Sequence, residues 1–586
     1  MDRPSSKIID YIIVDKKIFD NSNIAESYAG VTTPLTFSFV QYVYQEVYQH
    51  FSKMMGVSDK TIKKNEETFK HMVELIGCQI YYNLSSWHKM LTLFPGYQFS
   101  AELMEMMMGV EKRNRIAKVK KSSFFLKYFY YFPKTILHAV YIFFSFVTLG
   151  FRVRRFNSYF EQTFSDLKAI NLEELDLSEL RDVFWKADTK LLSHWKVPIA
   201  NDFAVMISTG LTDKLFMKWF PSDSAYSHIR MLAGNQKNLI SLDPGDKLTE
   251  IAEKIKQDTS LESLFLGQYS EKHVLKLLRE EFKESPARKA FEDYLQYFGA
   301  RMPNELKLES ETLMEKPEDL VALIRSFLAA ESSGHVSADN EYTEVAFNEI
   351  TFVRKVVLKI LLRWSSLSVS RREEARFSRT LIFGYVRNIF LSIGKLFEEK
   401  GVIDNKRDIF YLTIEEVFDL IDGQKLHDKP FIVINQRKKE FNSWQELKLP
   451  RRIETTKSIA QVEAEISDQK SINQDRSKVL TGRVASRPSK LNQLSGTALT
   501  LDKFDPAADF TGKILVTCQT DPGWTVIFPL LKGVIVERGG MLSHAAIVAR
   551  ELNIPCLVGV ENATKMILNG ASIEMDLQKG LVEQKR

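Results

Sequence analysis

The sequence predicts a multidomain protein in which a large, mostly α-helical region is followed by a small α/β domain. Three observations lead to this fold class. The chain has 586 residues, more than one hydrophobic core usually supports. From about residue 34 to 430, apolar residues recur every three or four positions, as on the buried face of a helix. After about residue 480, short apolar runs separated by turns replace this pattern.

These changes divide the chain into three expected segments. Residues 1–435 are expected to form the α-helical domain and residues 480–586 the compact α/β domain. Residues 436–479 are expected to be a charged linker, because they are polar and have few large apolar residues after Leu449. Such a stretch is typical of a solvated helix and also of a tether that lets the next domain move. The sequence is compatible with both interpretations.

Within the C-terminal domain, the expected elements are short strands around one helix. The helix is predicted to run from His544 to about Leu552, because Asn553 suits the left-handed residue that ends a helix and Pro555 prevents its continuation. The apolar or alternating runs expected to be strands are KILVT (513–517), GVIVE (533–537), CLVGV (556–560) and SIEMD (572–576).

The composition argues against several classes of protein. The formal net charge is only +5, from 80 basic and 75 acidic side chains, so a dedicated nucleic-acid binder is not expected. The cysteines Cys78, Cys518 and Cys556 lie far apart, which indicates neither a disulfide framework nor a metal site. The N-terminus lacks the apolar core of a signal peptide, so we expect a cytoplasmic protein.

One apolar segment qualifies that expectation. Residues 135–151 carry no formal charge over 17 positions and have basic flanks. A membrane-spanning helix needs about 20 apolar residues, so this run is short, and a buried helix is the favoured interpretation. The alternative is contact with a membrane surface through residues 123–151.

The strongest chemical motif is GGMLSHAAIVARE, residues 539–551. Ser543 suits the N-cap of a helix, while Gly539 and Gly540 permit backbone geometry closed to other residues. His544 would then be the first helical residue. A helix N-terminus disfavours imidazolium, which keeps the ring a neutral nucleophile, and its free N–H groups suit phosphate. The motif therefore predicts a phosphohistidine, although a histidine at a helix start is more often a cap or surface residue.

Residues 514–560 resemble the phosphohistidine swivelling domain of the phosphoenolpyruvate-utilising enzymes, which include phosphoenolpyruvate synthase and rifampicin phosphotransferase. The resemblance implies that His544 carries a phosphoryl group between two remote sites. The residues that match the family's supporting positions are Thr520, Asp521 and Gly523 of the TDPG loop, Gly539, Gly540, Ser543 and Arg550. The first strands depart from the family pattern, with ASRPSKLNQLSG where many members have a Ser-Pro-Gly turn.

The helical region resembles the middle domain of the same enzymes. In YFGARMPNELKL, residues 297–308, the family usually has a histidine where this chain has Ala300. Arg301 and Glu305 match the family and are candidates for the acceptor site; the alternative is a structural ion pair between them. The missing histidine puts phosphorylation of a rifampicin-type drug in doubt.

The resemblance also implies a partner. Members of the family begin with an ATP-grasp domain, but only about 25 residues precede the first matching segment at 26–39, and no Walker motif is present. ATP and Mg²⁺ are therefore expected on a separate ATP-grasp protein, and no metal or other cofactor on this chain.

The expected function is that of a phosphotransferase subunit. His544 would receive the phosphoryl group from the partner and pass it to a small-molecule acceptor on the helical domain. The alternative is a non-catalytic regulatory or scaffold protein in which the histidine is phosphorylatable or vestigial.

Overall fold

The structure is a computed structural model whose contacts divide the chain into two compact units. Unit 1 contains residues 1–206 and 385–471, and unit 2 contains residues 207–384 and 472–586. The residues that the structure describes are 12–13, 16–94, 117–118, 144, 147–219, 243–330, 351–424, 429–467 without 446 and 448, 479–488, 491–540 and 543–584.

Unit 1 combines helices with a small antiparallel sheet. The sheet has the order β3-β4-β2-β6, with bounds Val73–Ile76, Gln79–Asn83, Lys17–Asp20 and Arg452–Thr455. Aromatic rings hold the helices together: Phe184 of α9 (Leu177–Lys190) lies against Phe39 of α1 (Pro34–Met54), with ring centroids 6.2 Å apart. Further helices of this unit are α2 (Asp59–Lys64), α3 (Glu66–Lys70), α4 (Leu84–Leu91), α8 (Leu149–Lys168) and α19 (Ile414–Ile421).

Part of the expected linker belongs to the fold of unit 1. Residues 436–479 include most of α20 (Pro430–Gln445), strand β6 and helix α21 (Ile459–Ser467), and β6 pairs with β2. Widely spaced apolar side chains explain the difference: Leu449, Ile453 and Val462 join Phe19 and Tyr81 in one buried cluster. Of the expected linker, residues 468–478 lie outside the described part of the chain.

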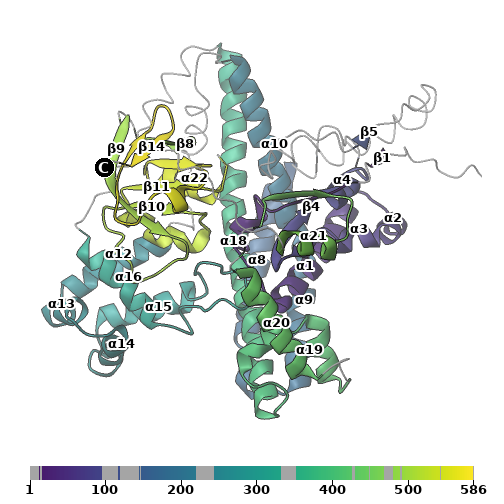
Figure 1. Ribbon diagram of the computed structural model, residues 1–586, viewed down its shortest axis with the longest axis horizontal. Coiled ribbons are helices and arrows are strands. Elements are labelled where there is room, and N and C mark those ends of the chain that lie inside the picture. Colours follow the sequence, from purple (N-terminus) through teal and green to yellow (C-terminus); the bar gives the residue numbers. More distant parts are fainter. Residues whose placement is uncertain are drawn as a thin grey trace, which may run out of the picture. The chain divides into compact units, whose positions relative to one another are not determined.

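Unit 2 contains the helical bundle, residues 243–330, and the histidine lobe, residues 479–584 (Figure 1). The helices of the bundle are α12 (Asp243–Lys256), α13 (Thr259–Leu266), α14 (Glu271–Glu280), α15 (Pro286–Phe298) and α16 (Glu318–Ala329). The division between the units falls within two long helices, α10 (Lys196–Trp219) and α18 (Phe352–Glu399).

The histidine lobe is built on an eight-stranded sheet with the order β7-β14-β13-β9-β10-β11-β12-β8. The four strands β9 to β12 run parallel, and the outer pairs are antiparallel. Their bounds are β7 Val479–Thr481, β8 Arg483–Ser486, β9 Gln493–Leu501, β10 Ile514–Thr517, β11 Gly533–Val536, β12 Cys556–Val558, β13 Ser572–Asp576 and β14 Leu581–Gln584. All four strands expected from the sequence are present.

Both faces of the parallel strands are buried, which explains their continuous apolar runs. Ile514 and Val516 belong to one apolar cluster, whereas Leu515, between them, belongs to another on the opposite face. Helix α22 (His544–Glu551) packs on β8 and β12, and the short helix α23 (Ala563–Met566) packs on β10.

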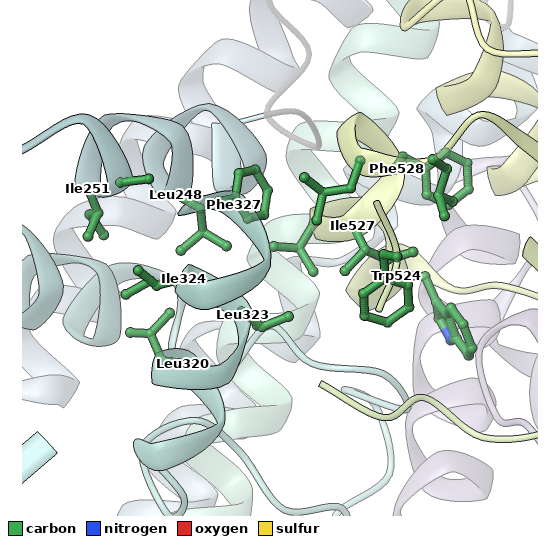
Figure 2. Packing of buried hydrophobic residues seen from close by; sticks show 14 of the residues in the cluster. Leu248, Ile251, Leu320, Leu323, Ile324, Phe327, Trp524, Ile527 and Phe528 are labelled. Carbon is green, nitrogen blue, oxygen red and sulfur yellow. The ribbon is translucent and has the colours of Figure 1, made fainter. Parts of the chain in front are cut away.

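The bundle and the lobe share one hydrophobic cluster. The 3₁₀ helix η6 (Pro522–Leu530) of the lobe packs against α12 and α16. Figure 2 shows Leu248 and Phe327 of the bundle near Ile527 of η6, and the same cluster continues through Trp524 and Phe528.

Of the apolar segment at 123–151, residues 123–143, 145 and 146 lie outside the described residues. Among the described helices, only α18 is long and apolar enough to cross a membrane, and most of its apolar stretch is buried. A buried core helix has the same properties, so this is weak evidence for a membrane span.

Candidate phosphohistidine site

His544 lies where the sequence predicts it, at the first position of α22. Ser543 is the N-cap, and its hydroxyl accepts a hydrogen bond from the backbone N–H of Ala546 at 3.5 Å. Gly539 has a φ of 121°, a conformation that side chains rarely allow, so this glycine is required by the turn. Gly540 has open space at its Cβ position and carries no such constraint.

The imidazole of His544 is buried, with only 3% of the residue exposed. Its Nε2 lies 3.1 Å from the hydroxyl of Thr525, and its Nδ1 has no hydrogen-bond partner among the described residues. Burial and the positive charge of Arg376, Arg301 and Arg372 lower the pKa of His544 to about 3, against the opposing effect of Glu373. The ring is therefore neutral near pH 7, as a nucleophile must be.

The charges that act on His544 come from outside the histidine lobe. Arg372, Glu373 and Arg376 belong to α18, and the Glu373 carboxylate lies 3.1 Å from Nη1 of Arg376 and 3.7 Å from Nε of Arg372. Burial alone would raise the pKa of Glu373, but the guanidinium groups of Arg376 and Arg372 hold it below its ordinary value. Glu373 is therefore a permanent anion that compensates only part of the surrounding positive charge.

The candidate acceptor residues, Arg301 and Glu305, lie on the segment that follows α15. Arg301 is 93% buried, its guanidinium lies 5.3 Å from the ring centre of Phe377, and its Nε and Nη1 have no hydrogen-bond partner among the described residues. The Glu305 carboxylate accepts a hydrogen bond from the hydroxyl of Thr380 at 2.6 Å. Burial raises the pKa of Glu305, an effect that Arg301 partly offsets.

The charge of Arg301 thus acts on His544, whereas Glu305 has its hydrogen-bond partner, Thr380, on α18. Ala300, where the family usually has histidine, lies on the same segment, and its Cβ would be 3.1 Å from a Cβ placed on Gly384 of α18.

The TDPG loop lies against that same segment. The Asp521 carboxylate accepts hydrogen bonds from the backbone N–H of Gly523 at 2.9 Å and from that of Asn304 at 2.6 Å. Burial raises the pKa of Asp521 to about 7. Thr520 is buried, and its hydroxyl has no hydrogen-bond partner among the described residues.

Arg550, the last of the predicted supporting residues, donates through Nη1 to the backbone carbonyl of Ala485 at 3.2 Å. This contact fixes α22 to β8, within the lobe. In the described parts of the chain, no group of three His, Cys, Asp or Glu side chains is arranged to hold a metal ion.

The site is a buried, neutral imidazole at a helix N-terminus, on which the charges of three guanidinium groups and one carboxylate act. Such surroundings stabilise a negatively charged group that becomes attached to the imidazole. A phosphoryl group is the simplest example.

Comparison with known protein families agrees with this chemistry. Residues 510–580 match the model of the PEP-utilising enzyme, mobile domain. Residues 199–373 match the model of the rifampicin phosphotransferase fourth domain. The chain therefore contains two segments similar to domains of the phosphoenolpyruvate-utilising enzymes.

Curated relatives extend the similarity over much of the chain. A rifampicin phosphotransferase of Bacillus subtilis is 28% identical over 316 residues, which are 51% of this chain and 34% of that protein. One from Bacillus cereus is 24% identical over 438 residues, 72% of this chain and 47% of that protein. A probable phosphoenolpyruvate synthase of Staphylothermus marinus is 35% identical over 142 residues, 22% of this chain and 16% of that protein. The chain thus spans between a third and a half of the two rifampicin phosphotransferases.

Four residues of the site were not predicted from the sequence: Thr525, Arg372, Glu373 and Arg376. The last three lie in RREEARFSR, residues 371–379, where arginines four apart share one helix face. Such a run of charged residues usually forms a solvated helix face. The burial of Arg372 and Glu373 marks them as site residues, and this burial is visible only in the structure.

Proposed function

We propose that this protein is a phosphotransferase in which His544 carries a phosphoryl group from a donor to an acceptor held in unit 2. The observation that carries the proposal is the buried, neutral His544, on which the positive charges of Arg301, Arg372 and Arg376 act. A neutral imidazole can attack phosphorus, and the guanidinium groups can stabilise the charge that arrives with it.

The reaction has two transfers. In the first, the imidazole nitrogen that carries no proton attacks a phosphorus atom of the donor, a P–N bond forms, and the P–O bond to the leaving group breaks with its electron pair on the leaving oxygen. The proton on the other ring nitrogen then passes to solvent, which leaves the phosphorylated ring neutral. In the second, an acceptor hydroxyl oxygen attacks the same phosphorus, the P–N bond breaks and the hydroxyl proton ends on the released imidazole nitrogen. The imidazole is then neutral again and ready for another cycle.

We further propose ATP, bound with Mg²⁺ on an ATP-grasp protein, as the donor. Similarity to the rifampicin phosphotransferases supports a phosphoryl donor of this type, and the buried His544 requires that the donor reach it in another arrangement of the lobe. The acceptor would bind beside Arg301, where guanidinium Nε and Nη1 are available as donors. Ala300 removes the imidazole that the family usually has there, so this acceptor does not use a histidine at position 300.

The test is phosphopeptide analysis after incubation with ATP, Mg²⁺ and a candidate ATP-grasp protein. We expect acid-labile phosphate on the peptide that contains His544, and none in the His544→Ala variant. His273→Ala, at an exposed position of α14 in the same unit, is the matched control and should label normally. Label on wild type and on His544→Ala alike would overturn the assignment.

A further inference from the structure

The TDPG loop resembles a phosphate-supporting loop in its sequence, but its contacts serve another purpose. Both oxygens of the Asp521 carboxylate are occupied by backbone N–H groups, one within the loop at Gly523 and one in the bundle's following segment at Asn304. A carboxylate would also repel a phosphoryl dianion. Asp521 is thus placed to join the lobe to the segment 301–305.

Gly523 makes the second contact between the same two turns. A Cβ at this position would lie 2.2 Å from the carbonyl carbon of Met302 and 2.2 Å from the nitrogen of Pro303, so only glycine fits. The turn that it contacts also has an uncommon backbone conformation. Asn304, whose N–H donates to Asp521, has a φ of 62°, in the left-handed region that few residues other than glycine adopt. The two turns fit each other backbone to backbone.

An apolar contact surrounds this polar one. Directly after Gly523, η6 places Trp524 and Ile527 in the cluster that it shares with α12 and α16 (Figure 2). Pro529 lies against Gly245, at 3.1 Å from a Cβ placed there. An apolar contact tolerates small shifts, whereas the hydrogen bond from Asn304 to Asp521 and the close approach of Gly523 define one position.

We propose that the turn Thr520–Gly523 is a docking latch, which holds the histidine lobe on the turn Met302–Asn304 and must open before His544 can be loaded. The latch itself is inferred from the contacts alone; its link to loading rests on the proposed function. While the latch is closed, a donor protein cannot reach His544, because the residue is 97% buried. The hydroxyl of Thr525, two positions after Gly523, also lies within hydrogen-bond distance of its ring.

The experiment compares Asp521→Asn with Asp505→Asn by hydrogen exchange of the full-length protein. Asp505 is the matched control, because it is exposed on the same lobe and accepts a similar local hydrogen bond, from Ala507 N–H at 3.0 Å. In Asp521→Asn, one carboxylate oxygen becomes an N–H₂ donor that faces a backbone donor. We expect exchange of the 301–308 peptide to rise about tenfold in Asp521→Asn and to stay unchanged in Asp505→Asn.

Folding of the lobe is checked in the same data. Peptides from β10 and β11 should exchange as in wild type if the lobe is intact. Gly523→Ala is a second variant that disrupts the same contact, for use if Asp521→Asn fails to fold. Unchanged exchange of the 301–308 peptide in a folded Asp521→Asn or Gly523→Ala protein would overturn the latch.

Loading is measured separately, by the rate at which ATP and an ATP-grasp protein label His544. A latch that opens more often should raise this rate in Asp521→Asn, and an unchanged rate would overturn the gating role. The exchange result needs neither ATP nor a partner, so it decides on the latch even if the proposed function fails its own test.

Discussion

Replacing His544 by glutamine tests the central electrostatic feature of the site, a histidine that stays neutral because it is buried among arginines. Glutamine has a similar length, can still bond to the Thr525 hydroxyl and does not titrate. The substitution therefore removes the proton-binding group while keeping much of the shape. We expect it to change how the free energy of unfolding of unit 2 depends on pH.

The size of the effect follows from the two pKa values. His544 has an ordinary pKa of 6.5 when the chain is unfolded and one of about 3 in the folded protein. Between these values only the unfolded state binds the proton, so stability falls as the pH falls below 6.5. Each pH unit costs about 1.4 kcal/mol, which makes the loss about 2 kcal/mol at about pH 5.

Asp521 contributes a slope of the opposite sign. Its pKa is raised to about 7 in the folded protein, so the folded state binds the proton first and gains stability as the pH falls through that value. The pH profile of the wild-type protein alone is therefore not diagnostic. The informative quantity is the difference between wild type and His544→Gln, in which the contribution of Asp521 cancels.

Urea unfolding at about pH 5 and about pH 8 provides the measurement. Hydrogen exchange of peptides from α22 and β11, read at each urea concentration, follows unit 2 separately from unit 1. Between the two pH values, wild type should lose about 2 kcal/mol more than His544→Gln. Equal pH dependence in the two proteins would refute the reasoning, because it would mean that His544 titrates in the folded state as it does in water.

Three other substitutions have defined outcomes. Thr525→Val removes the hydroxyl at Nε2 of the histidine and should slow its phosphorylation about tenfold, measured by phosphopeptide labelling, while the fold persists. Arg376→Met leaves the buried Glu373 short of a partner and should destabilise unit 2 by about 3 kcal/mol in urea unfolding, with a rise in the Glu373 pKa. Gly539→Ala should cost about 1–3 kcal/mol, seen as a lower Tm, whereas Gly540→Ala should leave the Tm nearly unchanged.

Local chemistry explains which parts of the site were predictable. Ser543 and Gly539 favour the turn that leads into α22, and both lie within a few residues of His544. The position of His544 at the helix start could therefore be predicted from its neighbours in the sequence. Arg372 and Glu373 lie more than 160 positions earlier in the chain, and nothing near them in the sequence says which helix face is buried. Their role depends on tertiary packing, which a single sequence does not reveal.

The fold follows the same rule. The parallel strands β10, β11 and β12 are buried on both faces, and their unbroken apolar runs made them visible. Strand β6 has only four residues and one buried side chain, Ile453, so its polar surroundings dominated the pattern. Its pairing with β2, some 430 residues away, could not be anticipated from either segment alone.

The hydrophobic cluster that η6 shares with the bundle determines whether the histidine lobe is soluble when it is separated from the rest of the chain. Trp524, Ile527 and Phe528 are covered by side chains from residues 243–330, which belong to a separate stretch of the chain (Figure 2). A fragment with residues 472–586 alone would present these side chains to water and should aggregate or bind detergent. Co-expression with a second fragment, residues 207–384, should restore its solubility, because the cover is then supplied in trans.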